Sequence, residues 1–242
     1  MTGGDPSVRE FLIGRDFIGV HPWEAGAFSP EDLRRKTEDL KLRLASSVSS
    51  PVAPLLGIGE IGLDRLRERE ISPRMREIFE VQLKLAFEFN CPVVLHGAKC
   101  WGQVVKAVQG ACEQARKLRT EAFLFHGFSR SAGLIPDIVA LNGYISVGPA
   151  VLNDHAVNYR ELVKKIPPER LLLETDRTPE NAAACPSVRE VAAEVAKLRG
   201  MAIGELETIT DENAERFSGS WRLPSAAIDG SRKSDRIAPH LV

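Results

Sequence analysis

Four residues with metal-binding side chains each follow a short apolar segment of the chain: Glu60, His96, His126 and Asp176. Two imidazoles and two carboxylates are suitable ligands for a divalent cation. Because no thiolate joins them, they favour Zn²⁺, Mn²⁺, Co²⁺, Ni²⁺ or Mg²⁺ over a soft-metal site. Each residue alone has a structural alternative, such as a hydrogen-bonded histidine or a carboxylate that caps a turn. Taken together, the four predict a metal site.

Other residues near these positions are candidates for different roles. His21 follows the apolar residues 17–20, but Pro22 restricts the backbone before it, so substrate contact and a structural turn both stay open. Three aromatic side chains also follow predicted strands, and packing over the core is favoured for them over base stacking: Trp23, Trp101 and Phe128. The cysteines stand at no useful spacing from a histidine, which argues against a Cys–His nucleophile.

Strands alternating with helices must position these residues. Six strands are expected to end near six positions: His21, Glu60, His96, His126, Val147 and Asp176. Helices are expected at residues 30–45, 73–90, 102–118, 132–141, 155–165, 186–198 and 204–217. This alternation predicts a parallel sheet, and in a barrel the carboxyl ends of such strands face one mouth. The ligand candidates are therefore expected to converge there.

The composition fits one α/β domain. The chain has 242 residues, of which 43% are hydrophobic, and its formal net charge is −1, so no global basic excess indicates nucleic acid. We expect one barrel domain over residues 1–217 and a mobile tail over 218–242. No apolar run approaches the ~18 residues of a membrane span, and no leader pattern is present. Four unpaired cysteines then favour free thiols and a cytoplasmic location.

Seven short motifs occur in the order known from the TatD-type metal-dependent hydrolases, a family of deoxyribonucleases that this chain resembles. They lie at residues 19–24 (GVHPWE), 59–64 (GEIGLD), 92–96 (PVVLH), 125–129 (FHGFS), 143–149 (GYISVGP), 172–176 (LLETD) and 213–217 (NAERF). The resemblance implies a TIM-barrel-like (β/α) fold. It also implies hydrolysis of phosphoester bonds in DNA with a divalent metal ion such as Mg²⁺, Mn²⁺ or Zn²⁺.

The resemblance further implies roles for individual residues. The metal ligands would be Glu60, His96, His126 and Asp176. Glu60 would lie between two metals or hold the only one, and Asp176 would bind metal or take the proton from the attacking water. Apart from the resemblance, His21 is a candidate for substrate binding. Three cations stand where the chain departs from the family pattern and are candidates for contacts with substrate phosphates: Lys99, Arg130 and Arg177.

The chain departs from the family pattern at its start. The family has a strand ending in His-x-His, and no such pair occurs in this sequence, where only 20 residues precede His21. We therefore expect a barrel that is incomplete at its N-terminus, one bound metal rather than two, weak activity and self-association through open sheet edges. Three alternatives stay open: a relative that binds nucleic acid or a protein partner without hydrolysing, a natural chain that begins further upstream, and a hydrolase of another substrate.

Overall fold

A six-stranded parallel sheet forms the centre of the computed structural model, which describes residues 8–11, 16–49, 57–67, 69–115, 122–129, 132–178, 181–219 and 238–241. Its strands follow one another in chain order: β2 (Phe17–Ile18), β3 (Gly57–Asp64), β4 (Val93–Ala98), β5 (Phe123–Phe125), β6 (Gly143–Val147) and β7 (Leu171–Leu173). All six coincide with predicted strands. The α/β, TIM-barrel-like fold class is thereby confirmed.

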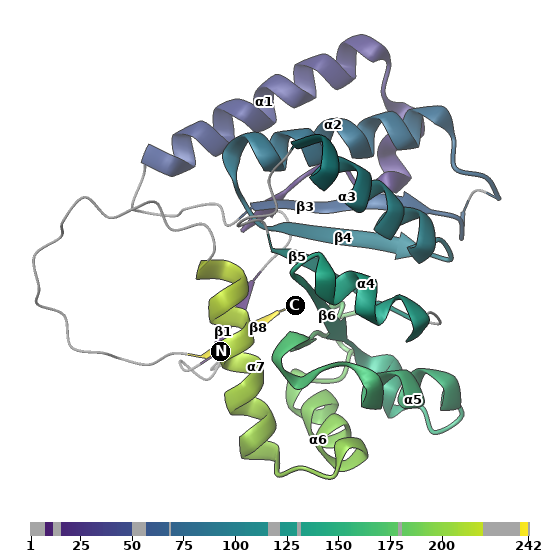
Figure 1. Cartoon of the computed structure of the whole chain (residues 1–242), viewed down its shortest axis with the longest axis vertical. Coiled ribbons are helices and arrows are strands. Elements are labelled where there is room, and N and C mark those ends of the chain that lie inside the picture. Colours follow the sequence, from purple (N-terminus) through teal and green to yellow (C-terminus); the bar gives the residue numbers. More distant parts are fainter. Residues whose placement is uncertain are drawn as a thin grey trace, which may run out of the picture.

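Helices connect these strands, as the alternating pattern predicts. They are α1 (Pro30–Ser49), α2 (Pro73–Phe89), α3 (Trp101–Ala115), α4 (Ile135–Ala140), α5 (Val157–Lys165), α6 (Val188–Arg199) and α7 (Ile203–Gly219). Short 3₁₀ helices add η1 (Pro22–Ala27), η2 (Ala132–Leu134), η3 (Pro149–Leu152) and η4 (Pro168–Arg170). Figure 1 shows α1, α2 and α3 beside β3 and β4, with α5 and α6 toward the other end of the sheet.

Local sequence signals explain where several helices begin. Ser72 caps α2 by accepting a hydrogen bond from the backbone N–H of Met75 at 3.1 Å, and Pro73 occupies the first helical position. Ser187 caps α6 in the same way and completes a capping box with Glu190. These caps satisfy backbone N–H groups that the first helical turn leaves without partners. Accordingly α2 starts at the predicted residue 73, and α6 starts at Val188 instead of the predicted residue 186.

Four strand ends differ from the prediction. β2 and β7 each end about three residues before the expected position, at Ile18 and Leu173. Glu60 and His96 were expected at the ends of their strands, but β3 continues to Asp64 and β4 to Ala98. The two strands keep pairing because Gly62 allows their backbones to approach closely beyond Glu60. Glu60 and His96 therefore lie within the paired region of the sheet.

The ring of Phe217, from α7, shows that the sheet is curved. Its centroid lies 5.9 Å from that of Phe17 in β2 and 5.8 Å from that of Tyr144 in β6. In a flat sheet these two strands would be about 19 Å apart, four strand spacings. All three rings are buried and pack with Val94, Leu124 and Leu172 on the inner face of the sheet. The larger part of the core lies between the sheet and the outer helices.

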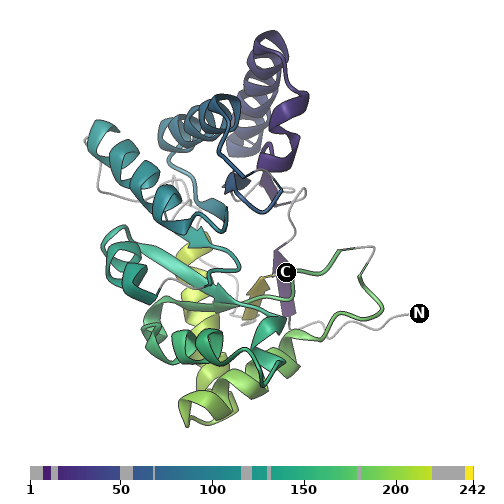
Figure 2. The same cartoon turned by 90° about the vertical axis from the view of Figure 1, so that its right-hand side faces the viewer.

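The described parts of the two terminal segments pair with each other. Strand β1 (Val8–Phe11) runs parallel to β8 (Ala238–Leu241), and β8 contacts α7 and β7. Figure 2 shows the two strands side by side. The remainder of the expected tail, and with it most of the predicted mobile segment, lies outside the described residues. Domain bounds of 1–217 and self-association through the end strands β2 and β7 stay predictions.

No helix within the described ranges is long and apolar enough to cross a membrane.

Candidate metal centre

Glu60 and Asp64 reach the two nitrogens of the His96 ring. In the pairing of β3 with β4, Gly62 lies opposite His96, so the two acidic residues stand on either side of that histidine. His96 Nδ1 lies 3.3 Å from Glu60 Oε1, and Nε2 donates to Asp64 Oδ2 at 2.9 Å. Burial lowers the pKa of His96, but its contacts with Glu60 and Asp64 outweigh burial and raise that pKa, so protonation of the ring is favoured.

Gly62 makes this pairing possible. Its φ of +153° is unfavourable for residues with a side chain, and a Cβ atom there would lie 2.0 Å from the carbonyl oxygen of His96. The register of the two strands also shifts between Ile58 and Ile61, a bulge that redirects the intervening segment carrying Glu60. The glycine and the bulge together turn the Glu60 carboxylate toward the histidines.

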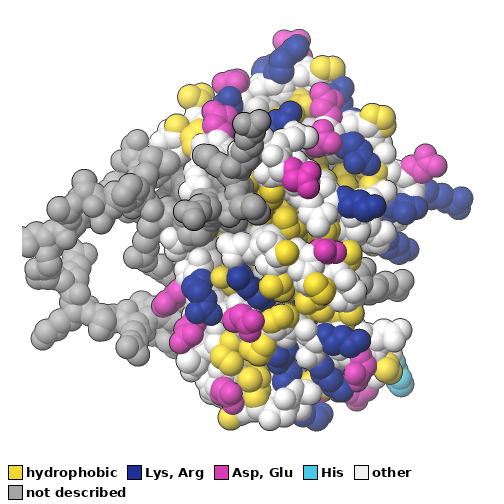
Figure 3. All heavy atoms as spheres, viewed as in Figure 1, with side chains coloured by type: hydrophobic (Ala, Val, Ile, Leu, Met, Phe, Trp, Pro, Cys, Tyr) yellow, Lys and Arg dark blue, Asp and Glu magenta, His cyan; other side chains and the backbone are white. Residues whose placement is uncertain are grey.

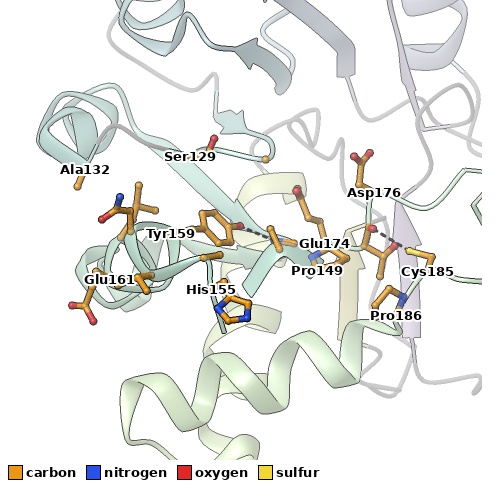
Figure 4. Close-up of a pocket in the computed structure, with 18 of the residues that line it drawn as sticks. Ser129, Ala132, Pro149, His155, Tyr159, Glu161, Glu174, Asp176, Cys185 and Pro186 are labelled. Carbon is orange, nitrogen blue, oxygen red and sulfur yellow. Dashed lines mark hydrogen bonds between the residues drawn. The ribbon is translucent and has the colours of Figure 1, made fainter. Parts of the chain in front are cut away.

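His126, which directly follows β5, also has a carboxylate near each of its two ring nitrogens. Its Nδ1 lies 2.6 Å from Oε2 of Glu174, which directly follows β7. Its Nε2 lies 3.5 Å from Glu60 Oε1 and 3.5 Å from Asp176 Oδ1. Figure 4 shows the carboxylates of Glu174 and Asp176 directed to the same side. Glu174 is buried, whereas the side chain of Asp176 is 72% exposed.

Neighbouring donor atoms of this group lie at separations that suit a cation. Atoms that bind one ion at about 2.1 Å lie roughly 3.0–3.4 Å apart. The distances from Glu60 to His96 and to His126, and from His126 to Asp176, are 3.3–3.5 Å. Among the described residues, the group whose ligand atoms all lie within 4.8 Å of one another is His21, Glu60 and His96. The structure thus links the four predicted ligands pair by pair without gathering all four around one point, and their binding of metal stays a prediction.

His21 joins the group through Glu60, at 3.9 Å between Nε2 and Oε2. It is the N-cap of η1, because its Nδ1 accepts a hydrogen bond from the backbone N–H of Trp23 at 3.3 Å. A neutral ring that accepts at Nδ1 carries its proton on Nε2. Burial lowers the pKa of His21 to about 4, which keeps the ring neutral. The Nε2–H of His21 therefore faces the Glu60 carboxylate, at a distance too long for a direct hydrogen bond.

The charged state of Glu60 is favoured by its neighbours. Burial raises its pKa, but the rings of His126 and His96 outweigh burial and lower that pKa to about 2. For His126 burial lowers the pKa, but Glu174 and Glu60 outweigh it and raise the pKa well above its ordinary value. The centre is therefore a compact group of carboxylates that attracts positive charge, whether protons or a metal cation.

Sequence reasoning missed Asp64 and Glu174. Both lie within quoted motifs, and both are buried carboxylates that hold a histidine ring by its second nitrogen. Carboxylates in this position fix the tautomer of a ligating histidine. Their signal in the sequence was spacing: Asp64 stands four residues after Glu60 on one strand, and Glu174 two residues before Asp176.

The predicted substrate-binding residues have different locations. Lys99 is exposed and lines a cleft of about 1070 Å³ that contains the histidines, Glu60 and Asp176. Arg177 is exposed and is not among the residues lining that cleft. Arg130 lies outside the described residues. Among the three aromatics, Trp101 and Phe128 are buried as expected, whereas Trp23 is 49% exposed and lines the cleft.

A second cleft, of about 1270 Å³, adjoins the first and shares Gly127, Ser129, Asp176 and Asn181 with it. Its wall includes Tyr159, whose hydroxyl accepts a hydrogen bond from the backbone N–H of Gly148 at 3.1 Å (Figure 4). On the face drawn in Figure 3, acidic and basic side chains are interspersed without a large patch of either sign.

The chain matches one protein-family model and several known proteins. The family model described as "TatD related DNase" matches residues 15–219. A metal-dependent hydrolase of Bacillus subtilis, YabD, is 32% identical over 209 residues, covering 83% of this chain and 75% of that protein. The protein named 3′-5′ ssDNA/RNA exonuclease TatD of Edwardsiella piscicida is 25% identical over 207 residues, covering 81% and 77%.

The fold has solved counterparts as well. The crystal structure of the TatD homologue YjjV of Escherichia coli matches with a TM-score of 0.63 and 24% identity, covering 83% of this chain and 75% of that one. A hydrolase of the same family from Entamoeba histolytica matches with a TM-score of 0.65, 17% identity, and 83% and 73% coverage. These likenesses confirm the barrel-like fold.

Proposed function

Because this chain belongs to the TatD-related DNase family of metal-dependent hydrolases, we propose that it cleaves phosphodiester bonds in DNA. One observation carries the proposal: Glu60, His96, His126 and Asp176 line one cleft, and neighbouring donor atoms among them lie 3.3–3.5 Å apart. The name of the Edwardsiella relative supports single-stranded nucleic acid as the substrate class.

The proposed ligands are the four residues of the cluster, with Mg²⁺, Mn²⁺ or Zn²⁺ as the candidate ions. A bound divalent cation supplies an activated water and neutralises charge on the phosphate oxygens. The two carboxylate oxygens of Glu60 face different neighbours. Oε1 lies near His96 and His126, and Oε2 lies near His21. It is therefore placed to hold the ion at the centre of the cluster.

The exposed Asp176 is the proposed proton acceptor for water entering from the cleft. Its side chain reaches solvent, whereas Glu60 is enclosed by three imidazoles. The hydrogen bond to His126 lowers the pKa of Asp176, so the carboxylate is ionised at neutral pH. Lys99, at the rim of the same cleft, is proposed to contact a substrate phosphate.

The purified chain tests this proposal directly. Its metal content is measured, and its cleavage of single-stranded DNA is followed with Mg²⁺, Mn²⁺ or Zn²⁺. His96→Ala and His126→Ala should lose metal and activity together, while the exposed His155→Ala serves as the matched histidine control. If the chain binds DNA and metal but cleaves nothing, the alternative of an inactive nucleic-acid-binding relative replaces this proposal. Cleavage by both alanine variants at the parent rate would contradict the assigned site.

A further inference from the structure

Trp23 is a large aromatic side chain held in an exposed position. It is 49% exposed and lines the cleft that contains the metal cluster. Its indole Nε1–H donates to Asp64 Oδ2 at 2.6 Å, and its ring centroid lies 4.7 Å from that of His21. Exposure of such a ring loses the favourable burial of apolar surface, while these contacts fix its orientation. The position favours contact with a ligand over packing in the core.

A cation already stacks on this ring. The guanidinium carbon of Arg67 lies 3.7 Å from the centroid of the Trp23 ring. A planar guanidinium stacks on aromatic faces and can itself carry a stacked base. Arg65 and Lys99 line the cleft beside Trp23, and Arg67 lies on the ring outside the residues that line it. An aromatic ring combined with positive charge is the arrangement by which proteins bind single-stranded nucleic acid without reading its sequence.

The ring also lies close to the proposed site of chemistry. Its centroid is 6.2 Å from that of His96, and Asp64 contacts both side chains. A base resting beside Trp23 would leave the attached phosphate free to extend toward the cluster. Because the ring and the guanidinium are already ordered, binding would lose little conformational freedom.

We propose that Trp23 and Arg67 form a stacking platform for a nucleobase adjacent to the cleaved phosphodiester. This inference rests on the proposed function and adds a binding subsite to it. The platform recognises the face of the base rather than its edge, so it accepts each of the four bases. The affinity for a single strand should therefore depend on its bases as well as on its phosphates.

Two variants of Trp23 distinguish stacking on its ring from the hydrogen bond that its indole N–H donates to Asp64. Trp23→Phe and Trp23→Leu both remove the N–H that donates to Asp64, but only phenylalanine keeps an aromatic face. Binding of a fluorescent phosphorothioate oligothymidylate, whose backbone resists cleavage, is measured by anisotropy with Mg²⁺ present. An abasic oligomer of the same length and backbone is the matched ligand. Thermal melting of each variant confirms that it is folded.

We expect Trp23→Leu to weaken binding of oligothymidylate by about tenfold or more, and Trp23→Phe by much less. Binding of the abasic oligomer should change little in both. Arg67→Ala should weaken both oligomers and lower the salt dependence of binding. Equal affinity of the parent chain for both oligomers, or equal loss in the two Trp23 variants, overturns the platform but leaves the proposed function intact. Failure of the parent chain to bind either oligomer overturns both.

Discussion

Glu174 Oε2 lies 2.6 Å from Nδ1 of His126, and this contact leaves Nε2 of the same ring directed at Glu60 and Asp176. Glu174 is buried and also accepts a hydrogen bond from the hydroxyl of Ser146. A buried carboxylate on one imidazole nitrogen increases the basicity of the ring and holds the other nitrogen in position. Glu174 is therefore assigned as a positioning residue for a predicted metal ligand.

Glu174→Gln should lower metal affinity without unfolding the chain. Glutamine has the same shape but is neutral, and it can turn its amide N–H toward His126 and reverse the tautomer. We expect the Kd for Zn²⁺ or Mn²⁺, measured by competition with a chelating dye, to rise by about 10–100-fold. Ser146→Ala, which removes the hydroxyl that bonds Glu174 and the backbone N–H of Gly127 but leaves the Glu174 carboxylate on His126, should have a smaller effect. A Glu174→Gln protein with the parent Kd would refute the positioning role.

The sequence predicts the fold well because its strands and helices carry local signals. The six strands, and the serine caps before α2 and α6, depend on short-range patterns that each segment contains within itself. The meeting of Glu60 with His96 and His126 follows from parallel strands that end at one side of a sheet. These parts of the candidate site could be predicted without coordinates.

Other parts of the candidate site depend on strand register and on the solvent exposure of side chains, which the sequence of a single segment does not determine. The placing of Gly62 opposite His96, which puts Asp64 on one side of the ring, is a property of two paired strands. In the same way, nothing local distinguishes the exposed Trp23 from the buried Trp101, since both follow predicted strands. Tertiary packing decides which of two similar aromatic residues faces solvent.

Replacement of His21 tests whether its ring binds metal or serves only as the N-cap of η1. Because Nδ1 accepts from the Trp23 backbone, His21→Ala and His21→Asn should both keep the metal content of the parent chain. Asparagine is a good N-cap and alanine is not, so only the alanine variant should lose about 1 kcal/mol of unfolding free energy. Elemental analysis and denaturant unfolding measure the two effects. Loss of metal from both variants, to the level of His126→Ala, would make His21 a ligand.

Two glycine-to-alanine changes should have opposite effects on stability. At Gly62 a Cβ atom would meet the His96 carbonyl at 2.0 Å and φ is +153°, so Gly62→Ala should lower the unfolding free energy by at least about 2 kcal/mol. At Gly110, within α3, a Cβ atom meets nothing within 4 Å. Gly110→Ala should raise the free energy of unfolding by about 0.5–1 kcal/mol. Urea denaturation of both variants checks the pair, and equal stabilities would contradict the close approach of β3 and β4.

Asp211 should make stability depend on pH. It lies on α7, and its Oδ1 is buried with no hydrogen-bond partner within the described ranges. Burial, together with Glu207 and Glu215 one turn away on either side, raises its pKa to about 6. The folded chain therefore keeps this proton up to about pH 6, whereas the unfolded chain releases it near pH 4. The contribution of Asp211 to stability is greatest below pH 4 and is lost as the pH rises through 6.

Asp211→Asn removes this titration, so the variant should melt above the parent at pH 7.5 and close to it at pH 4. Because the carboxylate is partly exposed, solvent screening limits the gain to about 1 kcal/mol, or about 2–4 °C in Tm. Asp39→Asn, at an exposed carboxylate paired with Lys36, is the control and should show a small difference that varies little with pH. Melting curves recorded from pH 4 to pH 8 give the difference in Tm directly. A constant difference across that range would show that Asp211 does not titrate there.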